Sequence, residues 1–254
     1  MGSARDTGMS KVPEVTLLFW IIKIGATTLG ETGGDAVSMS MHLGYLAATG
    51  IFAVIFLLAV GAQIAAKRFH PFLYWTTIIA TTTVGTTLAD FADRSLGIGY
   101  AGGAVLLFAL LIVSLVVWYR TLGSVAVDTV SSPKAEMFYW VTIMLSQTLG
   151  TALGDWTADS VGLGLGYTGG AAVFGGLLAL VAAAYYWTNV SHTILFWAAF
   201  ILTRPLGAVV GDFLDKPLDK GGLDLSRFTA SATLLALIIF CIFFFPHRPA
   251  KRAH

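Results

Sequence analysis

Long apolar stretches alternate along this chain with short polar connections. Eight stretches reach about 20 residues, the length that a helix needs to cross the hydrocarbon core of a membrane. Pro13, Pro71 and Pro133 stand at or just before three of the starts, where the first turn of a helix tolerates proline. The pattern predicts an all-α membrane protein with eight transmembrane helices, at residues 13–37, 43–66, 71–93, 98–120, 135–159, 166–187, 192–214 and 227–246.

Every odd-numbered helix of this prediction carries the same signature, Gly-x-x-x-small-Asp, with a Trp ten residues before the first Gly. The even-numbered helices are plain: residues 51–60 and 234–245 contain almost nothing polar, as expected of lipid-facing or packing scaffold. The repeat is thus a pair of helices, motif helix first, and it occurs four times. The copies begin at Gly30, Gly85, Gly150 and Gly207, end at Asp35, Asp90, Asp155 and Asp212, and follow Trp20, Trp75, Trp140 and Trp197.

Spacing groups the repeats into two similar halves. Trp20 to Trp140 spans nearly as many residues as Trp75 to Trp197, and segment 96–103 recurs with few changes at 163–170. We expect a first half at 11–125 and a second at 126–246, between a disordered, tag-like N-terminus at 1–10 and a basic cytoplasmic tail at 247–254. Two-helix repeats return the chain to its starting side, so the motif helices should run parallel and form the inner bundle.

Loop charges set the expected orientation. Lys and Arg are more numerous on the side of both termini, which predicts cytoplasmic termini and a multi-pass protein of the bacterial inner membrane. Each motif Trp falls in the first two turns of its helix, where an aromatic belt at the membrane interface is expected. Each motif Asp follows its Trp by about 22 Å along the helix. The four aspartates should therefore share one level in the outer half of the membrane.

Composition agrees with a membrane protein. Hydrophobic residues make up 56% of the chain and charged residues 11%, against about a quarter charged in soluble domains. The single cysteine, Cys241, lies in an apolar run, so the chain has no disulfide framework and no cysteine metal site. No phosphate loop, nucleophile triad or redox motif is visible, so we expect no enzyme and no organic cofactor. Membrane lipid is the expected partner, nucleic acid is not, and a homo-oligomer is compatible with the sequence.

The motif combines small residues that let helices approach closely with a carboxylate that packing does not explain. Carboxylates at helix C-terminal ends meet a negative dipole, so a cation or proton must offset them. Oxygen ligands suit Mg²⁺, Ca²⁺ or Mn²⁺. A single loop histidine is more often solvated than a ligand, but His42 on the same side, as a ligand, would favour Mn²⁺ or another transition metal. The predicted packing positions are Gly30, Gly34, Gly85, Gly150, Gly154, Gly207 and Gly211, and the predicted metal ligands are Glu31, Asp35, Asp90, Asp155 and Asp212.

Further polar residues follow the motif helices at helical spacing and predict a polar pathway through the bundle. Its outermost acids are equally well explained as solvated groups at the outer interface. The pathway residues are Thr28, Thr83, Thr86, Asp93, Gln147, Thr148, Thr151, Asp159 and Asp215.

Two basic residues stand inside the predicted spans. Arg204 lies at mid-membrane depth, where a guanidinium needs an acidic partner, and Glu31 is the expected one. Arg204 then acts either as an internal cation that replaces the substrate or as a fixed counter-ion. Pro205 beside it should kink or break its helix. Lys23 is shallower, and its ammonium is expected to reach the cytoplasmic face.

The repeated Trp-x₉-Gly-x₃-small-Asp pattern over eight spans resembles a group of poorly characterised bacterial integral membrane proteins. The resemblance covers nearly the whole chain after Met9 and carries no established activity. A looser likeness relates residues 31–35 to cation exchangers with a duplicated Glu-x-Gly-Asp motif. The segment here has one residue more, and the other three copies lack the Glu, so this likeness is an analogy.

The sequence favours transport of a divalent metal cation, with Mn²⁺ as the first choice and Mg²⁺ or Ca²⁺ next. Export by exchange with protons is the expected mode, because clustered carboxylates can trade a metal for protons. Two alternatives stay open. One is transport of protons or a small organic cation without a metal. The other is a non-transporting scaffold or signalling partner that uses the small-xxx-small faces for assembly.

Overall fold

The computed structural model describes residues 10–250, and expectations about residues 1–9 and 251–254 lie outside this range. Short π-helical segments at Ala36–Ser40 and Phe91–Ser95 continue the first and third helices, and single 3₁₀ turns lie at Val127–Thr129 and Leu218–Lys220. Ser10, expected to be disordered, is buried and donates a hydrogen bond to the carbonyl of Val127. The described range contains eight α-helices: α1 (Leu17–Asp35), α2 (Gly44–Ala65), α3 (Pro71–Asp90), α4 (Tyr100–Leu122), α5 (Pro133–Ala158), α6 (Gly166–Trp187), α7 (His192–Asp215) and α8 (Arg227–Phe244).

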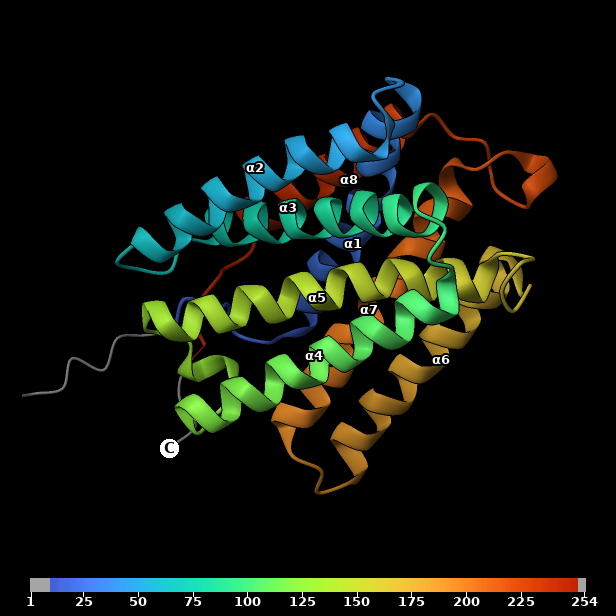
Figure 1. Ribbon diagram of the computed structural model, residues 1–254. Coiled ribbons are helices and arrows are strands. Elements are labelled where there is room, and N and C mark those ends of the chain that lie inside the picture. Colours follow the sequence, from blue (N-terminus) through green and yellow to red (C-terminus); the bar gives the residue numbers. More distant parts are fainter. Residues whose placement is uncertain (1–9, 251–254) are drawn as a thin grey trace, which may run out of the picture.

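The four motif helices form a closed inner ring, in which α1 packs on α3, α3 on α5, α5 on α7, and α7 on α1. The outer helices cover this ring: α2 lies on α3, α4 on α5, α6 on α7, and α8 on α1 (Figure 1). The predicted inner position of the motif helices is therefore confirmed. Each outer helix packs mainly against the motif helix of the next repeat, so the two helices of one repeat do not form a packed hairpin.

The outer surface of the bundle is apolar. By length and composition, five helices of the described range qualify as membrane spans: α2, α4, α6, α7 and α8. Helices α1, α3 and α5 are of similar length, but they carry the Thr and acidic side chains and have most of their residues buried. Placing polar groups inside the ring keeps them away from lipid, where they would be costly.

Small residues set the close spacing of the inner ring, as the motif predicted. A Cβ atom added at Gly85 would lie 2.9 Å from backbone atoms of Gln147 and Thr148 in α5. A Cβ at Gly150 would collide with Arg204, and one at Gly207 would collide with Thr27. Each motif glycine thus meets the next inner helix around the ring, which lets the four backbones approach closely.

Each inner helix turns every fourth residue toward the interior of the ring, and we call these rows the axial stripes. They pass from aromatic side chains at the N-terminal end to four aspartates at the C-terminal end, and every member is buried. The stripes are Phe19, Lys23, Thr27, Glu31 and Asp35 in α1; Tyr74, Ile78, Thr82, Thr86 and Asp90 in α3; Tyr139, Ile143, Gln147, Thr151 and Asp155 in α5; and Phe196, Phe200, Arg204, Ala208 and Asp212 in α7.

Aromatic rings close the N-terminal end of the inner ring. The first stripe residue of each helix contacts the motif Trp of the next helix, and the hydroxyls of Tyr74 and Tyr139 lie 2.6 Å apart. We call this layer the aromatic seal. Its ring-centroid distances are 5.4 Å for Phe19–Trp75, 5.8 Å for Tyr74–Trp140, 6.3 Å for Tyr139–Trp197 and 5.8 Å for Phe196–Trp20.

The aromatic seal corrects the expectation of an interfacial belt. Trp75, Trp140 and Trp197 are buried and Trp20 is half-buried, so these rings fill the core instead of facing the membrane interface. Because the aromatic ends of all four helices meet one another, as do the aspartate ends, the inner helices run parallel. A second correction concerns α7: it continues as one helix through Pro205, so the alternative that Pro205 breaks the helix is wrong.

Candidate cation site

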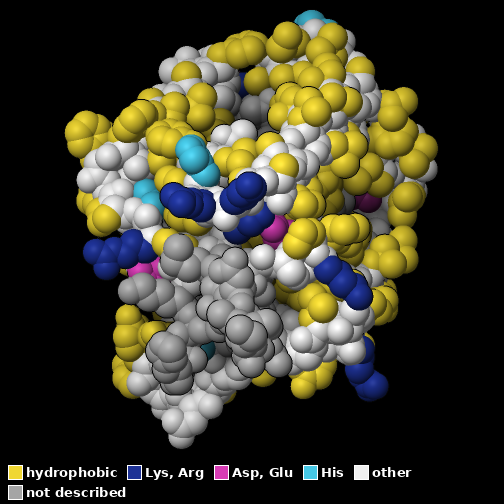
Figure 2. Space-filling view, turned by 90° about the vertical axis from the view of Figure 1, so that its left-hand side faces the viewer, with side chains coloured by type: hydrophobic (Ala, Val, Ile, Leu, Met, Phe, Trp, Pro, Cys, Tyr) yellow, Lys and Arg dark blue, Asp and Glu magenta, His cyan; other side chains and the backbone are white. Residues whose placement is uncertain are grey.

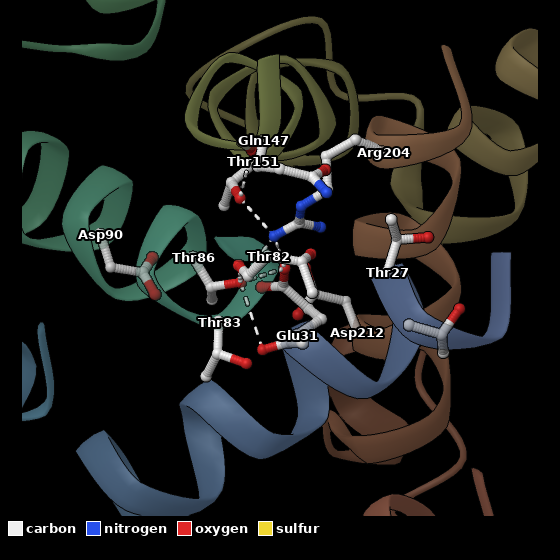
Figure 3. Close-up of polar contacts among 12 residues, drawn as sticks. Thr27, Glu31, Thr82, Thr83, Thr86, Asp90, Gln147, Thr151, Arg204 and Asp212 are labelled. Carbon is white, nitrogen blue, oxygen red and sulfur yellow. Dashed lines mark hydrogen bonds and ion pairs between the residues drawn. The ribbon is translucent and has the colours of Figure 1, made fainter. Parts of the chain in front are cut away.

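Arg204 of α7 points toward side chains of α1, α3 and α5 (Figure 3). In the axial stripe of α7 it lies between the aromatic residues and Asp212. Its Nη2 donates to Glu31 Oε2 at 2.9 Å and to the hydroxyl oxygens of Thr86 and Thr151, both at 2.5 Å. These three acceptors hold the same stripe position in three different helices. The predicted ion pair between Arg204 and Glu31 is therefore present, and it lies where the four repeats converge.

Buried carboxylates form two overlapping groups on the side of Arg204 that faces away from the aromatic seal. In the inner trio, Glu31, Asp35 and Asp90 each bring an oxygen within 4.8 Å of the others. In the outer trio, Asp35, Asp212 and Asp215 do the same. Asp35 belongs to both trios. Asp155, a predicted ligand, belongs to neither, and Asp215, predicted only as a pathway residue, belongs to the outer one.

Two basic residues pair with the four motif aspartates, two aspartates each. Arg94 lies 3.0 Å from Asp90 and 3.7 Å from Asp155, whereas Lys216 contacts Asp35 and lies 2.7 Å from Asp212. Neither Arg94 nor Lys216 is predicted as a site residue from the sequence. The signal that would have revealed them is their spacing, four residues after a motif aspartate, which continues the axial stripe by one turn.

Lys23 does not reach the cytoplasmic face as expected. Its side chain is fully buried, and Nζ lies 4.2 Å from the centroid of the Phe200 ring. Nζ has no hydrogen-bond acceptor among residues 10–250. The residue belongs to the axial stripe of α1, which directs the amine into the ring between the aromatic seal and Arg204.

The predicted threonine pathway divides into two classes. Thr86 and Thr151 lie on the axial stripes and bind Arg204, and Gln147 is a buried stripe residue one turn earlier. The hydroxyls of the remaining three threonines each donate to a carbonyl one turn back in their own helix, which fits a packing role. They are Thr28, which donates to Ile24, Thr83, which donates to Ile79, and Thr148, which donates to Met144.

The outermost predicted acids differ from one another. Asp215 is buried and accepts a 2.8 Å hydrogen bond from Arg227 Nε. Asp93 is half-buried and has no ion pair within residues 10–250. Asp159 directly follows α5 and lies in a polar loop. The Val161 amide and the Tyr100 hydroxyl donate hydrogen bonds to its carboxylate, and the bond from Val161 lowers the pKa of Asp159.

His42 is exposed in the turn before α2, with a φ of 56°.

A cavity of about 690 Å³ leads to the aspartates from the C-terminal end of the ring. Arg94, Lys216, Asp155 and Asp212 line it together with polar loop residues. The opposite end carries the aromatic seal. Of the clustered carboxylates, Asp155 and Asp212 are therefore reached directly from the C-terminal end of the ring.

Ion pairs at this site join more acids than bases. Within residues 10–250, six carboxylates pair with four cations, Arg94, Arg204, Lys216 and Arg227. If every group is ionised, two negative charges stay uncompensated. That excess equals the charge of one divalent cation or of two protons, either of which would lower the cost of burying the acids.

These features define a multi-pass membrane protein with a buried acidic cluster. The chain belongs to a family described as Repeat of Unknown Function (DUF347), which matches at residues 18–69, 73–124, 138–191 and 195–248. Each match contains one inner helix and the outer helix that follows it, so the predicted four-fold repeat is confirmed. No curated protein and no solved structure matches the chain significantly.

Proposed function

We propose that this protein transports a divalent metal cation through the inner ring, with Mn²⁺ as the first choice and Mg²⁺ or Ca²⁺ next. The observation that carries the proposal is the sharing of Asp35 between two buried carboxylate trios. Overlapping trios offer a cation two adjacent sets of hard oxygen ligands. An ion can move from one set to the other while Asp35 stays bound, which suits transfer better than static storage.

The two trios lie in sequence along the route from the cavity. The outer trio comes first, because Asp212 lines the cavity. The inner trio includes Glu31, which Arg204 binds directly. Beyond Arg204 stand Lys23 and the aromatic seal, so an ion entering from the cavity stops at the inner trio. Transport would then require the seal to open while the cavity closes, as in the alternating access of repeat-built transporters.

Exchange with protons is the proposed mode of coupling. The six carboxylates lie in one buried cluster, and their protonation states affect one another. When a divalent ion leaves, protons can restore the positive charge that the carboxylates lose. Arg204 serves as the internal counter-ion of this cluster, because its three hydrogen bonds hold it at the centre of the ring.

We further propose that the protein lies in the bacterial inner membrane with both termini in the cytoplasm. Lys and Arg side chains gather on the face at which the inner helices begin (Figure 2). An excess of positive charge is typical of cytoplasmic loops. The cavity would then face the outer side of the membrane.

Uptake of radioactive Mn²⁺, Mg²⁺ and Ca²⁺ into vesicles, with and without a pH gradient, tests the function. Wild-type protein should accumulate at least one of these ions, and a pH gradient should change its rate. Asp35→Asn should abolish accumulation, whereas Asp219→Asn, at an exposed position on the cavity wall, should retain it. Proton flux without metal flux would favour the proton or organic-cation alternative. Absence of any flux would favour a scaffold.

A further inference from the structure

Lys216 sits where a metal bound to the outer trio would sit. Its Nζ lies 2.7 Å from Asp212 Oδ1 and 3.4 Å from Asp215 Oδ1. It also contacts Asp35, the carboxylate that both trios share. The three acids that come close enough to hold a metal ion are thus the three that surround this ammonium.

We propose that Lys216 determines the charge specificity of the outer trio, because its tethered ammonium excludes monovalent cations and yields only to divalent ones. This inference rests on the proposed function and deepens it. Lys216 is neither a ligand nor a fixed counter-ion in this account. It is a competitor that belongs to the chain and occupies the site until a substrate displaces it.

The charge balance of the trio explains the selectivity. Three carboxylates face Lys216 and Arg227, whose Nε lies 2.8 Å from Asp215, and this leaves one negative charge uncompensated. A monovalent ion that replaced the ammonium would leave the balance unchanged. A divalent ion would remove the remaining charge, which is expensive to keep in a buried site. Sodium or potassium therefore gains nothing over Lys216, whereas Mn²⁺ does.

Displacement requires movement of the side chain alone. The backbone of Lys216 is fixed, because its amide donates to the backbone carbonyl of Asp212 and its carbonyl accepts from the Asp224 amide, both at 2.9 Å. The side chain lines the cavity, so its ammonium can turn from the trio toward the open end. Lysine carries its charge on a flexible, unbranched stem, which suits such an exchange.

Titration calorimetry of the full chain in detergent tests this role. Mn²⁺ is titrated into wild-type, Lys216→Met and Lys216→Arg proteins, each with and without excess Na⁺. Lys220→Met is the matched control, because Lys220 lines the same cavity and has no ion pair within residues 10–250. Thermal unfolding of each variant shows whether it is folded, and Lys216→Gln replaces the Met variant if that one is not.

We expect wild-type, Lys216→Arg and Lys220→Met proteins to bind Mn²⁺ with similar affinity and without competition from Na⁺. Lys216→Met should bind Mn²⁺ at least about tenfold more tightly, because the competing charge is gone, and Na⁺ should now compete. Unchanged or weaker Mn²⁺ binding by Lys216→Met, with no effect of Na⁺, would overturn the inference and leave the proposed function standing. If no variant and no wild-type protein binds a divalent ion, the proposed function fails as well.

Discussion

Gly85→Ala is the substitution that probes the inner ring most simply. Gly85 lies in α3 against the backbone of α5, and it precedes the motif aspartate Asp90. The added methyl group would lie 2.9 Å from the Gln147 carbonyl carbon and from the Thr148 amide nitrogen. Backbone atoms cannot rotate away as a side chain can. The two helices must therefore separate locally to admit the methyl group.

Two effects of opposite sign decide the change in stability. Overpacking of a tight contact costs about 1–3 kcal/mol. Alanine is favoured over glycine within a helix by about 1 kcal/mol. The expected result is a net loss of about 0–2 kcal/mol in the free energy of unfolding, because the helical preference offsets about 1 kcal/mol of the overpacking cost.

Gly50→Ala is the matched control for this substitution. Gly50 lies in the outer helix α2, and a Cβ there would have no neighbour within 4 Å. Only the helical preference acts, so this variant should be as stable as the wild type or slightly more so. Unfolding in mixed detergent micelles, followed by circular dichroism, measures both variants under one condition. A Gly85→Ala protein at least as stable as Gly50→Ala would refute the tight contact between α3 and α5.

Two further predictions concern the buried basic residues. Lys23→Met should raise the thermal unfolding temperature, because it replaces an amine without an acceptor by an apolar side chain of similar length. The expected gain in the free energy of unfolding is about 1–3 kcal/mol. An unchanged or lower unfolding temperature would contradict the burial of Lys23. Arg204→Met should destabilise the fold by about 3–5 kcal/mol, because it leaves Glu31 buried without its partner. Adding Glu31→Gln should restore part of that loss in the same unfolding assay, and a double variant no more stable than Arg204→Met would argue against the pair.

Much of the fold follows from local patterns in the sequence. Hydrophobic length predicts the helices, and the repeated motif predicts which of them lie inside, because glycines permit close packing and carboxylates must avoid lipid. The Arg204–Glu31 pair was predictable for the same reason, since a guanidinium at that depth needs an acid. These inferences depend on each helix alone or on one pair of residues.

The remaining features depend on how four helices meet. An amphipathic side chain such as that of Trp75 can lie at a membrane interface or in a protein core. Only the packing of the four inner helices against one another shows that it lies in the core. The position of Lys23 follows from the axial stripe of α1, which cannot be chosen until the inward face of the helix is known. Arg94 and Lys216 continue a stripe four residues after a motif aspartate, but only the packed ring shows that each pairs with an aspartate of a neighbouring helix. Thr28 is predicted as a pathway residue because it lies at helical spacing from Glu31. The inward position is Thr27 instead, and an offset of one residue turns a helical side chain by roughly 100°.

Mn²⁺ binding to Asp35→Asn protein, compared with Asp155→Asn in the same titration, tests the central claim most directly. Both substitutions remove one charge from a buried motif aspartate, but Asp35 belongs to both trios and Asp155 to neither. We predict that Asp35→Asn loses Mn²⁺ binding and that Asp155→Asn weakens it less. Equal affinities in both variants and the wild type would contradict the assignment of the buried carboxylates as a cation site.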